Sequence, residues 1–167
     1  MQSAEPHAAV PKRPGAGGEE SPRPVVIDAC FALKLVLPEE HSGQVREAWG
    51  HWVEDGVDVS APYLLAYEVA SVLCRKVFRK ELAPEEGEAA LLAIQAQGII
   101  LLHPEGLEQV AWQLAQRFNR PAVYDASYLA LAQLLDSVLW TADERLKNAL
   151  QGELPYLRWV GELPLSE

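Results

Sequence analysis

Short apolar runs alternate with amphipathic stretches along the chain from Val25 onward. A continuous apolar run of this length is typical of a strand that is buried on both faces of a parallel sheet. The runs predict five strands, at residues 25–28, 57–60, 99–102, 138–140 and 157–160. Because helical stretches separate them, we predict an α/β fold, a three-layer α/β/α sandwich with a five-stranded, mainly parallel sheet.

The stretches between these runs carry apolar residues at helical spacing. In residues 42–54 the spacing places Val45, Trp49, Trp52 and Val53 on one stripe, which we expect in the core. Pro62 is expected to open a long helix that continues to about Arg79, because proline is tolerated in a first helical turn. Further helices are predicted directly after Asp28 and at residues 84–97, 106–118, 125–135 and 143–150.

Residues 1–24 differ in composition from the rest of the chain. They are rich in Pro, Gly, Ala and Ser and show no periodic apolar pattern. Such a segment cannot bury enough apolar surface to offset the entropy of ordering it, so we predict a disordered tail. We expect the remaining residues, 25–167, to form one domain.

The charge and the apolar runs exclude several classes of protein. A net charge of −10 argues against a broad basic face that grips nucleic acid, because such binding neutralises phosphates with Lys and Arg. Contact with phosphate through a divalent ion remains open. No apolar run approaches the roughly 18–20 residues of a membrane span, and no secretory signal is evident. Cys30 and Cys74 are expected to be buried, free thiols, and the protein to be cytoplasmic.

Four carboxylates are candidates for one site. Asp28 and Asp143 each follow a predicted strand, and ligands collect at the carboxyl ends of parallel strands. Asp125 and Glu68 lie at helical positions where they can complete the site. Each Asp is also a plausible helix N-cap, and capping does not exclude a role in chemistry.

Glu68 is the most unusual of the four. Its predicted helix carries almost no other charge, and a buried carboxylate costs several kcal/mol unless it is paired or bound to a cation. The alternatives are an exposed stripe or a pair with Arg75. If all four acids converge, each close pair repels by about 4 kcal/mol at an effective dielectric of ~20. Either some protonate, or a divalent cation lies among them. Oxygen ligands with no His or Cys nearby favour Mg²⁺ or Mn²⁺.

The sequence resembles a known family, the PIN-domain ribonucleases, and most closely their VapC-type toxins from toxin–antitoxin pairs. The resemblance runs from residue 25 to about 162. It is carried by four segments in order: Val-Ile-Asp-Ala-Cys-Phe-Ala-Leu-Lys at 26–34, Pro62 with Glu68, Tyr-Asp-Ala-Ser-Tyr-Leu-Ala-Leu-Ala at 124–132, and Thr-Ala-Asp-Glu-Arg-Leu at 141–146.

The resemblance implies an endoribonuclease that depends on Mg²⁺ or Mn²⁺. It assigns Asp28, Asp125 and Asp143 to the metal and Glu68 to the attacking water. By the same resemblance, Thr141 would orient the carboxylates. Ser71 stands where the family often has Asn, and serine keeps one hydrogen-bonding group but has a shorter reach.

The implied partners are an RNA substrate, a small antitoxin protein and a second copy of the chain in a homodimer. Arg75 and Arg79 either steer RNA phosphate or form a solvated helix end, where cations are favoured by the helix dipole. Lys34 either contacts substrate or faces solvent. The alternative function is a PIN-fold protein whose main task is complex formation, with weak or no nuclease activity.

Overall fold

The predicted strands form one parallel sheet at the centre of the molecule. The computed structural model describes residues 22–150 and 152–163. Its strands are β1 (Val25–Ile27), β2 (Val59–Pro62), β3 (Ile100–Leu102), β4 (Val138–Thr141) and β5 (Leu157–Trp159). They lie in the order β3-β2-β1-β4-β5, and each neighbouring pair is parallel. The predicted five-stranded sheet is confirmed.

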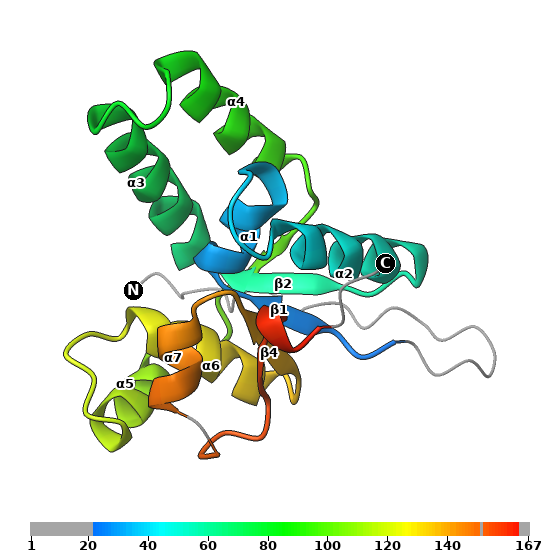
Figure 1. Ribbon diagram of the computed structural model, residues 1–167. Helices are drawn as coiled ribbons and strands as arrows, with labels where there is room; N and C mark the ends of the chain where they lie inside the picture. Colours follow the sequence, from blue (N-terminus) through cyan, green and yellow to red (C-terminus); the bar gives the residue numbers. More distant parts are fainter. Residues whose placement is uncertain (1–21, 151, 164–167) are drawn as a thin grey trace, which may run out of the picture.

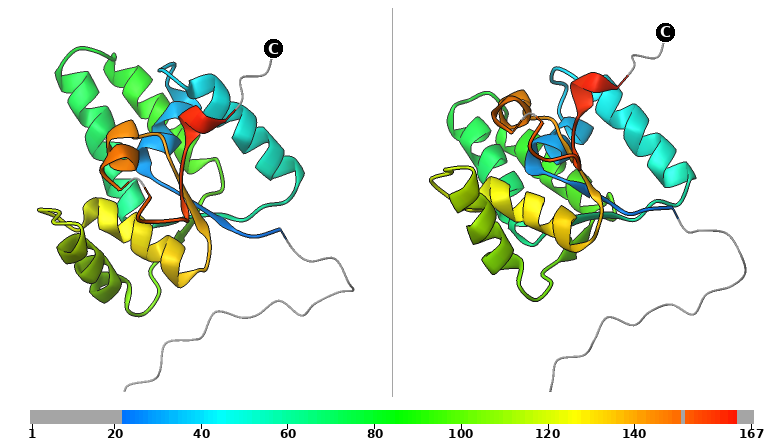
Figure 2. Two further views of the ribbon diagram at one scale, coloured as in Figure 1. Left: turned by 60° about the horizontal axis from the view of Figure 1, so that its bottom comes forward. Right: turned by 90° about the horizontal axis from the view of Figure 1, so that it is seen from below.

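Helices cover both faces of this sheet (Figure 1), as the three-layer prediction requires. Figure 1 shows α1 to α4 on one face and α5 and α6 on the other, and Figure 2 shows α6 crossing the sheet. The helices are α1 (Ala29–Val36), α2 (Ser42–Glu54), α3 (Leu64–Phe78), α4 (Pro84–Gln95), α5 (Leu107–Arg117), α6 (Tyr124–Leu134) and α7 (Glu144–Ala149), followed by the short 3₁₀ helix η1 (Val160–Glu162).

The core lies along the central strands. Val26 and Ile27 of β1 and Leu139 of β4 are fully buried, as expected for parallel strands covered on both faces. The edge strand β3 is more open, and Ile100 is exposed. Helix α6 packs against β1, β2 and β4, and its residues 129–132 are all buried. This packing fixes the start of α6, where Asp125 lies, relative to the ends of the central strands.

The chain direction also determines where a ligand can bind. From β1 the chain moves to β2 and β3 on one side, and later returns to β4 and β5 on the other side of β1. In open parallel sheets, a crevice forms at the carboxyl ends of the strands where the order reverses in this way. Asp28 follows β1 directly, and Asp143 comes two residues after β4. Both acids therefore stand at this crevice.

The second strand lies later in the sequence than predicted. It covers Val59–Pro62, and α3 begins at Leu64, so Pro62 ends a strand and does not open the helix. The register explains this: Pro62 pairs with Leu102 of β3, whereas the pairing with β1 stops at Ser60. Proline is tolerated at such a strand end, where it has a neighbour on one side only.

Three residues predicted to be buried are exposed. Val53 is 62% exposed near the end of α2, while Val45, Trp49 and Trp52 of the same stripe do face the core. Cys30 and Cys74 are also exposed, which contradicts their predicted burial. The apolar neighbours of each cysteine in sequence were misleading, because in a helix residues adjacent in sequence point in different directions.

Most of the predicted tail, residues 1–24, falls outside the described residues, which begin at Pro22. In the part of the chain that the structure describes, no helix combines the length and the apolar character of a membrane span.

Candidate active site

The four predicted carboxylates line one cleft. Its volume is about 490 Å³, and its walls include Asp28, Glu68, Asp125 and Asp143. The acids come from four separate parts of the chain: the end of β1, helix α3, the first turn of α6, and the residue before α7. The cleft is thus formed where the carboxyl ends of the central strands meet helices from both layers.

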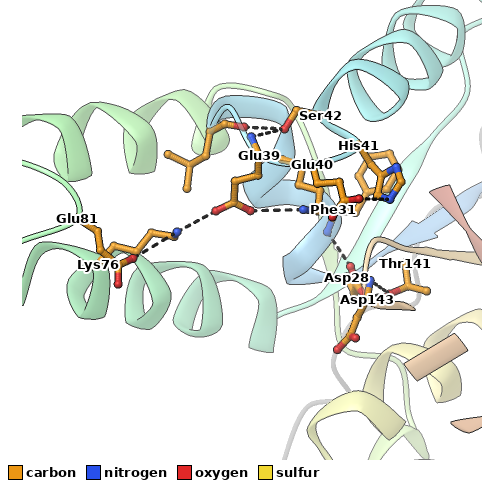
Figure 3. Close-up of polar contacts among 12 residues, drawn as sticks. Asp28, Phe31, Glu39, Glu40, His41, Ser42, Lys76, Glu81, Thr141 and Asp143 are labelled. Atoms are coloured by element: carbon orange, nitrogen blue, oxygen red, sulfur yellow. Dashed lines mark hydrogen bonds and ion pairs between the residues drawn. The ribbon is translucent and has the colours of Figure 1, made fainter. Parts of the chain in front are cut away.

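Asp28 caps α1 and faces the cleft at the same time (Figure 3). Its Oδ1 accepts a hydrogen bond from the Phe31 backbone N–H at 2.8 Å, and its Oδ2 accepts one from the Thr141 hydroxyl. The side chain is buried, and this burial raises its pKa to about 7. The two hydrogen bonds oppose that rise, whereas the nearby charges of Asp143 and Asp125 add to it.

Thr141 links the ends of β1 and β4. It is fully buried at the last position of β4, and its hydroxyl donates to Asp28. The same oxygen accepts from the Asp143 backbone N–H at 2.9 Å. One hydroxyl therefore contacts both aspartates, and the orienting role of Thr141 stays a prediction.

Asp143 begins α7 as its N-cap. Its Oδ1 accepts from the backbone N–H groups of Arg145 at 2.9 Å and Leu146 at 3.4 Å. The Arg145 side chain approaches the same oxygen at 3.4 Å but is itself almost fully exposed. A pair so open to water contributes little, so the backbone contacts chiefly hold Asp143 in place.

Glu68 is half-buried in the wall formed by α3, and Tyr128 of α6 holds its carboxylate. The Tyr128 hydroxyl donates to Oε2 of Glu68, and the tyrosine is 2% exposed. Burial raises the pKa of Glu68 and the charge of Asp125 adds to the rise, while the Tyr128 hydrogen bond and Arg75 lower it. The partner that the sequence did not predict is therefore Tyr128. It lies three residues after Asp125, so α6 presents both side chains to the cleft.

Asp125 is the most accessible of the four acids. It lies in the first turn of α6, whose N-cap is Val123, so Asp125 does not cap this helix as the sequence allowed. Its Oδ2 pairs with Arg120 at 2.8 Å. Arg120 lies just before the segment 124–132 that contains Asp125. Only this closeness in sequence could have indicated the ion pair between Arg120 and Asp125.

The structure separates the predicted supporting residues. Ser71 and Arg75 line the cleft beside Glu68, whereas Arg79 ends α3 and is not among its lining residues. Lys34 neither reaches the cleft nor faces open solvent, because its ammonium pairs with Glu39 at 3.4 Å. Glu39 also binds Lys76 at 2.8 Å, as Figure 3 shows. Lys34 lines a neighbouring hollow of about 340 Å³ that shares Asp143 with the cleft.

The donor chemistry of the cleft fits a hard divalent cation. The four acids supply oxygen ligands. Burial chiefly raises the pKa of Asp28 and Glu68, and the charges of neighbouring acids add to both rises. Cys30 also lines the cleft, contrary to the expectation that no cysteine is nearby. Although the residue as a whole is exposed, desolvation of its sulfur where it lines the cleft, helped by the charge of Asp28, raises the pKa of the thiol to about 12, so it stays protonated and is a poor ligand.

The acidic side chains of the cleft are not arranged as a complete set of metal ligands among the described residues. Within residues 22–150 and 152–163, no three His, Cys, Asp or Glu side chains form a group that could hold a metal ion. Two of the acids are engaged elsewhere, Asp125 with Arg120 and Asp143 with the start of α7. Binding of an ion would therefore require side chains around the cleft to move.

Comparison with known proteins now identifies the family. The family model of the PIN domain matches residues 25–149. The chain belongs to the PIN domain family. The resemblance to VapC-type proteins is confirmed as well: ribonuclease VapC9 of Mycobacterium tuberculosis is 34% identical over 131 residues, which cover 78% of this chain and 94% of the relative.

Two proteins of Pyrobaculum aerophilum extend the comparison. Ribonuclease VapC3 of Pyrobaculum aerophilum is 31% identical over 125 residues, covering 73% of this chain and 91% of the relative. The crystal structure of PAE2754 from the same organism superposes with a TM-score of 0.61 at 19% identity, covering 83% of this chain and 91% of that one. At this identity the superposition supports the PIN fold alone.

Proposed function

We propose that this PIN-domain protein is a divalent-metal-dependent endoribonuclease of the VapC type, the toxin of a toxin–antitoxin pair. One observation carries the proposal: carboxylates from four separate elements line one cleft at the carboxyl ends of the central strands. Burial and mutual repulsion raise the pKa of two of them. The ribonuclease names of the VapC relatives support the choice of RNA as substrate.

Asp28, Asp125 and Asp143 are the proposed ligands of Mg²⁺ or Mn²⁺. When bound, such an ion stabilises charge on a phosphate and makes water easier to deprotonate. Glu68 is proposed to accept the proton of the attacking water, and a pKa raised toward neutrality suits a general base. Tyr128 orients the Glu68 carboxylate through its hydroxyl. Ser71 and Arg75 line the same wall of the cleft, and we propose that they contact the phosphate.

The partners follow from the same proposal. An antitoxin would cover the acidic cleft with a segment that carries Arg or Lys, because the cleft presents four carboxylates and, among its lining residues, the single cation Arg75. The homodimer, the cytoplasmic location and the RNA contacts of Arg79 and Lys34 stay predictions. Of these contacts, that of Lys34 would require its ion pair with Glu39 to open.

Cleavage of RNA by matched variants tests the proposal. Purified protein is incubated with total cellular RNA, with Mg²⁺ or with EDTA, beside the variants Glu68→Gln and Glu88→Gln. Glu88 is an exposed acid of α4 outside the cleft, so it controls for loss of one negative charge. We expect Glu68→Gln to lower the cleavage rate by roughly 100-fold or more, and EDTA to abolish it. Cleavage that survives EDTA or Glu68→Gln refutes the mechanism.

One observation favours the second candidate, a complex-forming protein with weak or no cleavage: no described side chains make a ready three-ligand group for an ion. The same experiment separates the two functions. A protein that cleaves no RNA with Mg²⁺ or Mn²⁺, and yet binds a single-stranded RNA or an antitoxin tightly, has the second function.

A further inference from the structure

Two tyrosines stand exposed at the rim of the acidic cleft. Tyr67 of α3 is 76% exposed and Tyr124 of α6 is 57% exposed, and both line the cleft with the four acids. Each directly precedes an acid, Glu68 and Asp125 respectively. Because consecutive helical residues point about 100° apart, the acid can face inward while the ring before it lies at the rim. The mechanism proposed above uses neither ring.

The negative charge of the protein favours a source of RNA affinity other than positively charged side chains. Proteins usually gain affinity for RNA by neutralising phosphates with Lys and Arg. Here the whole chain carries a net charge of −10, and Arg75 is the one cation among the described residues that line the cleft. Stacking of bases on aromatic rings needs no positive charge and tolerates any base, since every base has a π-face.

The two rings also come from different helical layers of the fold. Tyr67 belongs to the helical layer of α3, and Tyr124 to the layer of α6 on the other face of the sheet (Figure 1). An RNA strand that crosses the cleft from one layer to the other can contact one ring from each layer. Only unpaired bases can turn out of a helix and stack in this way.

We propose that Tyr67 and Tyr124 form a pair of stacking subsites for unpaired RNA bases at the rim of the acidic cleft, one contributed by each helical layer. This inference rests on the proposed ribonuclease function and deepens it. It makes base stacking on these two rings, more than phosphate attraction, the source of affinity.

RNA binding by aromatic variants tests the inference. The probe is a short, fluorescein-labelled single strand of adenosine nucleotides, and binding is followed by fluorescence anisotropy in the Glu68→Gln background. The variants are Tyr67→Ala and Tyr124→Ala, with Tyr67→Phe and Tyr124→Phe to keep the rings. Phe78→Ala and Trp112→Ala are the controls, because Phe78 and Trp112 are 89% and 61% exposed but do not line the cleft.

We expect each Tyr→Ala change to weaken binding roughly 5- to 150-fold, the range found for single stacked bases. The Tyr→Phe variants and the two controls should bind the single strand like the parent. The dependence of affinity on salt should keep its slope, because no phosphate contact is lost. A duplex of the same strand with its complement should bind weakly to every variant.

Unchanged affinity in both Tyr→Ala variants, or equally tight binding of the duplex, overturns the inference. The proposed function would then still stand, because it is decided by the cleavage tests on Glu68→Gln and EDTA. Circular dichroism checks folding, and since both rings are exposed, their removal should leave the core intact. Weakened binding to an antitoxin with unchanged binding to RNA would also count against the subsites.

Discussion

The two sides of the cleft hold their acids in different ways. On the strand side, formed by Asp28, Thr141 and Asp143, the contacts are buried hydrogen bonds or bonds to backbone N–H groups. On the helix side, formed by Glu68, Asp125, Tyr128 and Arg120, each acid is held by one side chain, a tyrosine hydroxyl or a guanidinium. Burial differs as well: Asp28 is buried, whereas Glu68 is half-buried and Asp125 is exposed.

The difference follows from how each side is built. The pairing of β1 with β4 ends at Ile27 and Trp140, and one step further along the two strands stand Asp28 and Thr141. Sheet register therefore brings these two side chains together. The helix side joins α3 to α6, which come from opposite layers and meet through long side chains. We expect the strand side to stay fixed when an ion or RNA binds, and the helix side to adjust.

The largest effect is expected from Asp28→Asn, which tests the strand side directly. Residues that only support metal ligands contribute roughly 10- to 100-fold to activity, so loss of a ligand should lower the cleavage rate by more than about 100-fold. The same variant should be more stable than the wild type without metal, because a buried carboxylate whose pKa is raised is costly to ionise.

The stability that Asp28→Asn gains over the wild type should depend on pH. The pKa of Asp28 is about 7 in the folded protein, whereas an unperturbed Asp side chain has a pKa of 3.8. The stability that protonated Asp28 contributes is therefore complete below about pH 4 and is lost as pH rises to 7. Above pH 7 the variant should therefore be the more stable by up to about 4 kcal/mol, since one pKa unit corresponds to about 1.4 kcal/mol. Urea unfolding in EDTA at pH 4 and pH 8 measures this, and an equal difference at both values would contradict it.

Thr141→Val should have the next largest effect, because it removes one hydroxyl that positions two acids. Valine has nearly the same shape, but it leaves Oδ2 of Asp28 and the N–H of Asp143 without this partner. The free energy of unfolding should fall by roughly 1–3 kcal/mol, and the cleavage rate by roughly 10- to 100-fold. Thr141→Ser keeps the hydroxyl and should retain most activity. If Thr141→Ser loses as much activity as Thr141→Val, packing of the methyl group matters as much as the hydrogen bonds.

Tyr128→Phe tests the helix side with a smaller effect. The Tyr128 hydroxyl stabilises ionised Glu68, so its loss should raise the pKa of Glu68 further. If Glu68 is the general base, the rising acid limb of the pH–rate profile moves to higher pH, by roughly one unit for a hydrogen bond to a charged group. A drop in rate that is the same at every pH would show that Tyr128 acts only through packing.

The sequence was sufficient to predict the elements that depend on local pattern. Buried parallel strands appear as continuous apolar runs, and β1 and β4 were predicted to within one residue. The prediction failed where contacts between residues distant in sequence determine the structure. The start of α3 depends on the pairing of Pro62 with β3, and the exposure of Cys30 depends on which face of α1 is covered.

In the candidate site, too, the sequence indicates the residues that depend on local pattern and misses those that depend on distant contacts. The acids could be found because each one breaks an apolar pattern at a strand end or inside a helix. Tyr128 could not, because a tyrosine in an apolar helix is ordinarily a core residue, and only the packing of α6 against the sheet brings its hydroxyl to Glu68. The pairing of Lys34 with Glu39 depends likewise on how the loop between α1 and α2 folds back.

The smallest effect is expected from Arg120→Ala. This variant tests whether the side chains of the helix side can rearrange to bind an ion. The pair of Arg120 with Asp125 is partly exposed, so its loss should change the free energy of unfolding by less than about 1 kcal/mol. Because Arg120 competes with an ion for the same carboxylate, its removal should tighten Mn²⁺ binding by a few-fold, measured by calorimetry. Arg117→Ala, which breaks an exposed pair with Glu153 outside the cleft, is the control and should leave Mn²⁺ affinity unchanged. Weaker Mn²⁺ binding in Arg120→Ala than in this control would mean that the guanidinium holds Asp125 in place for the ion, and that the helix side is as preformed as the strand side.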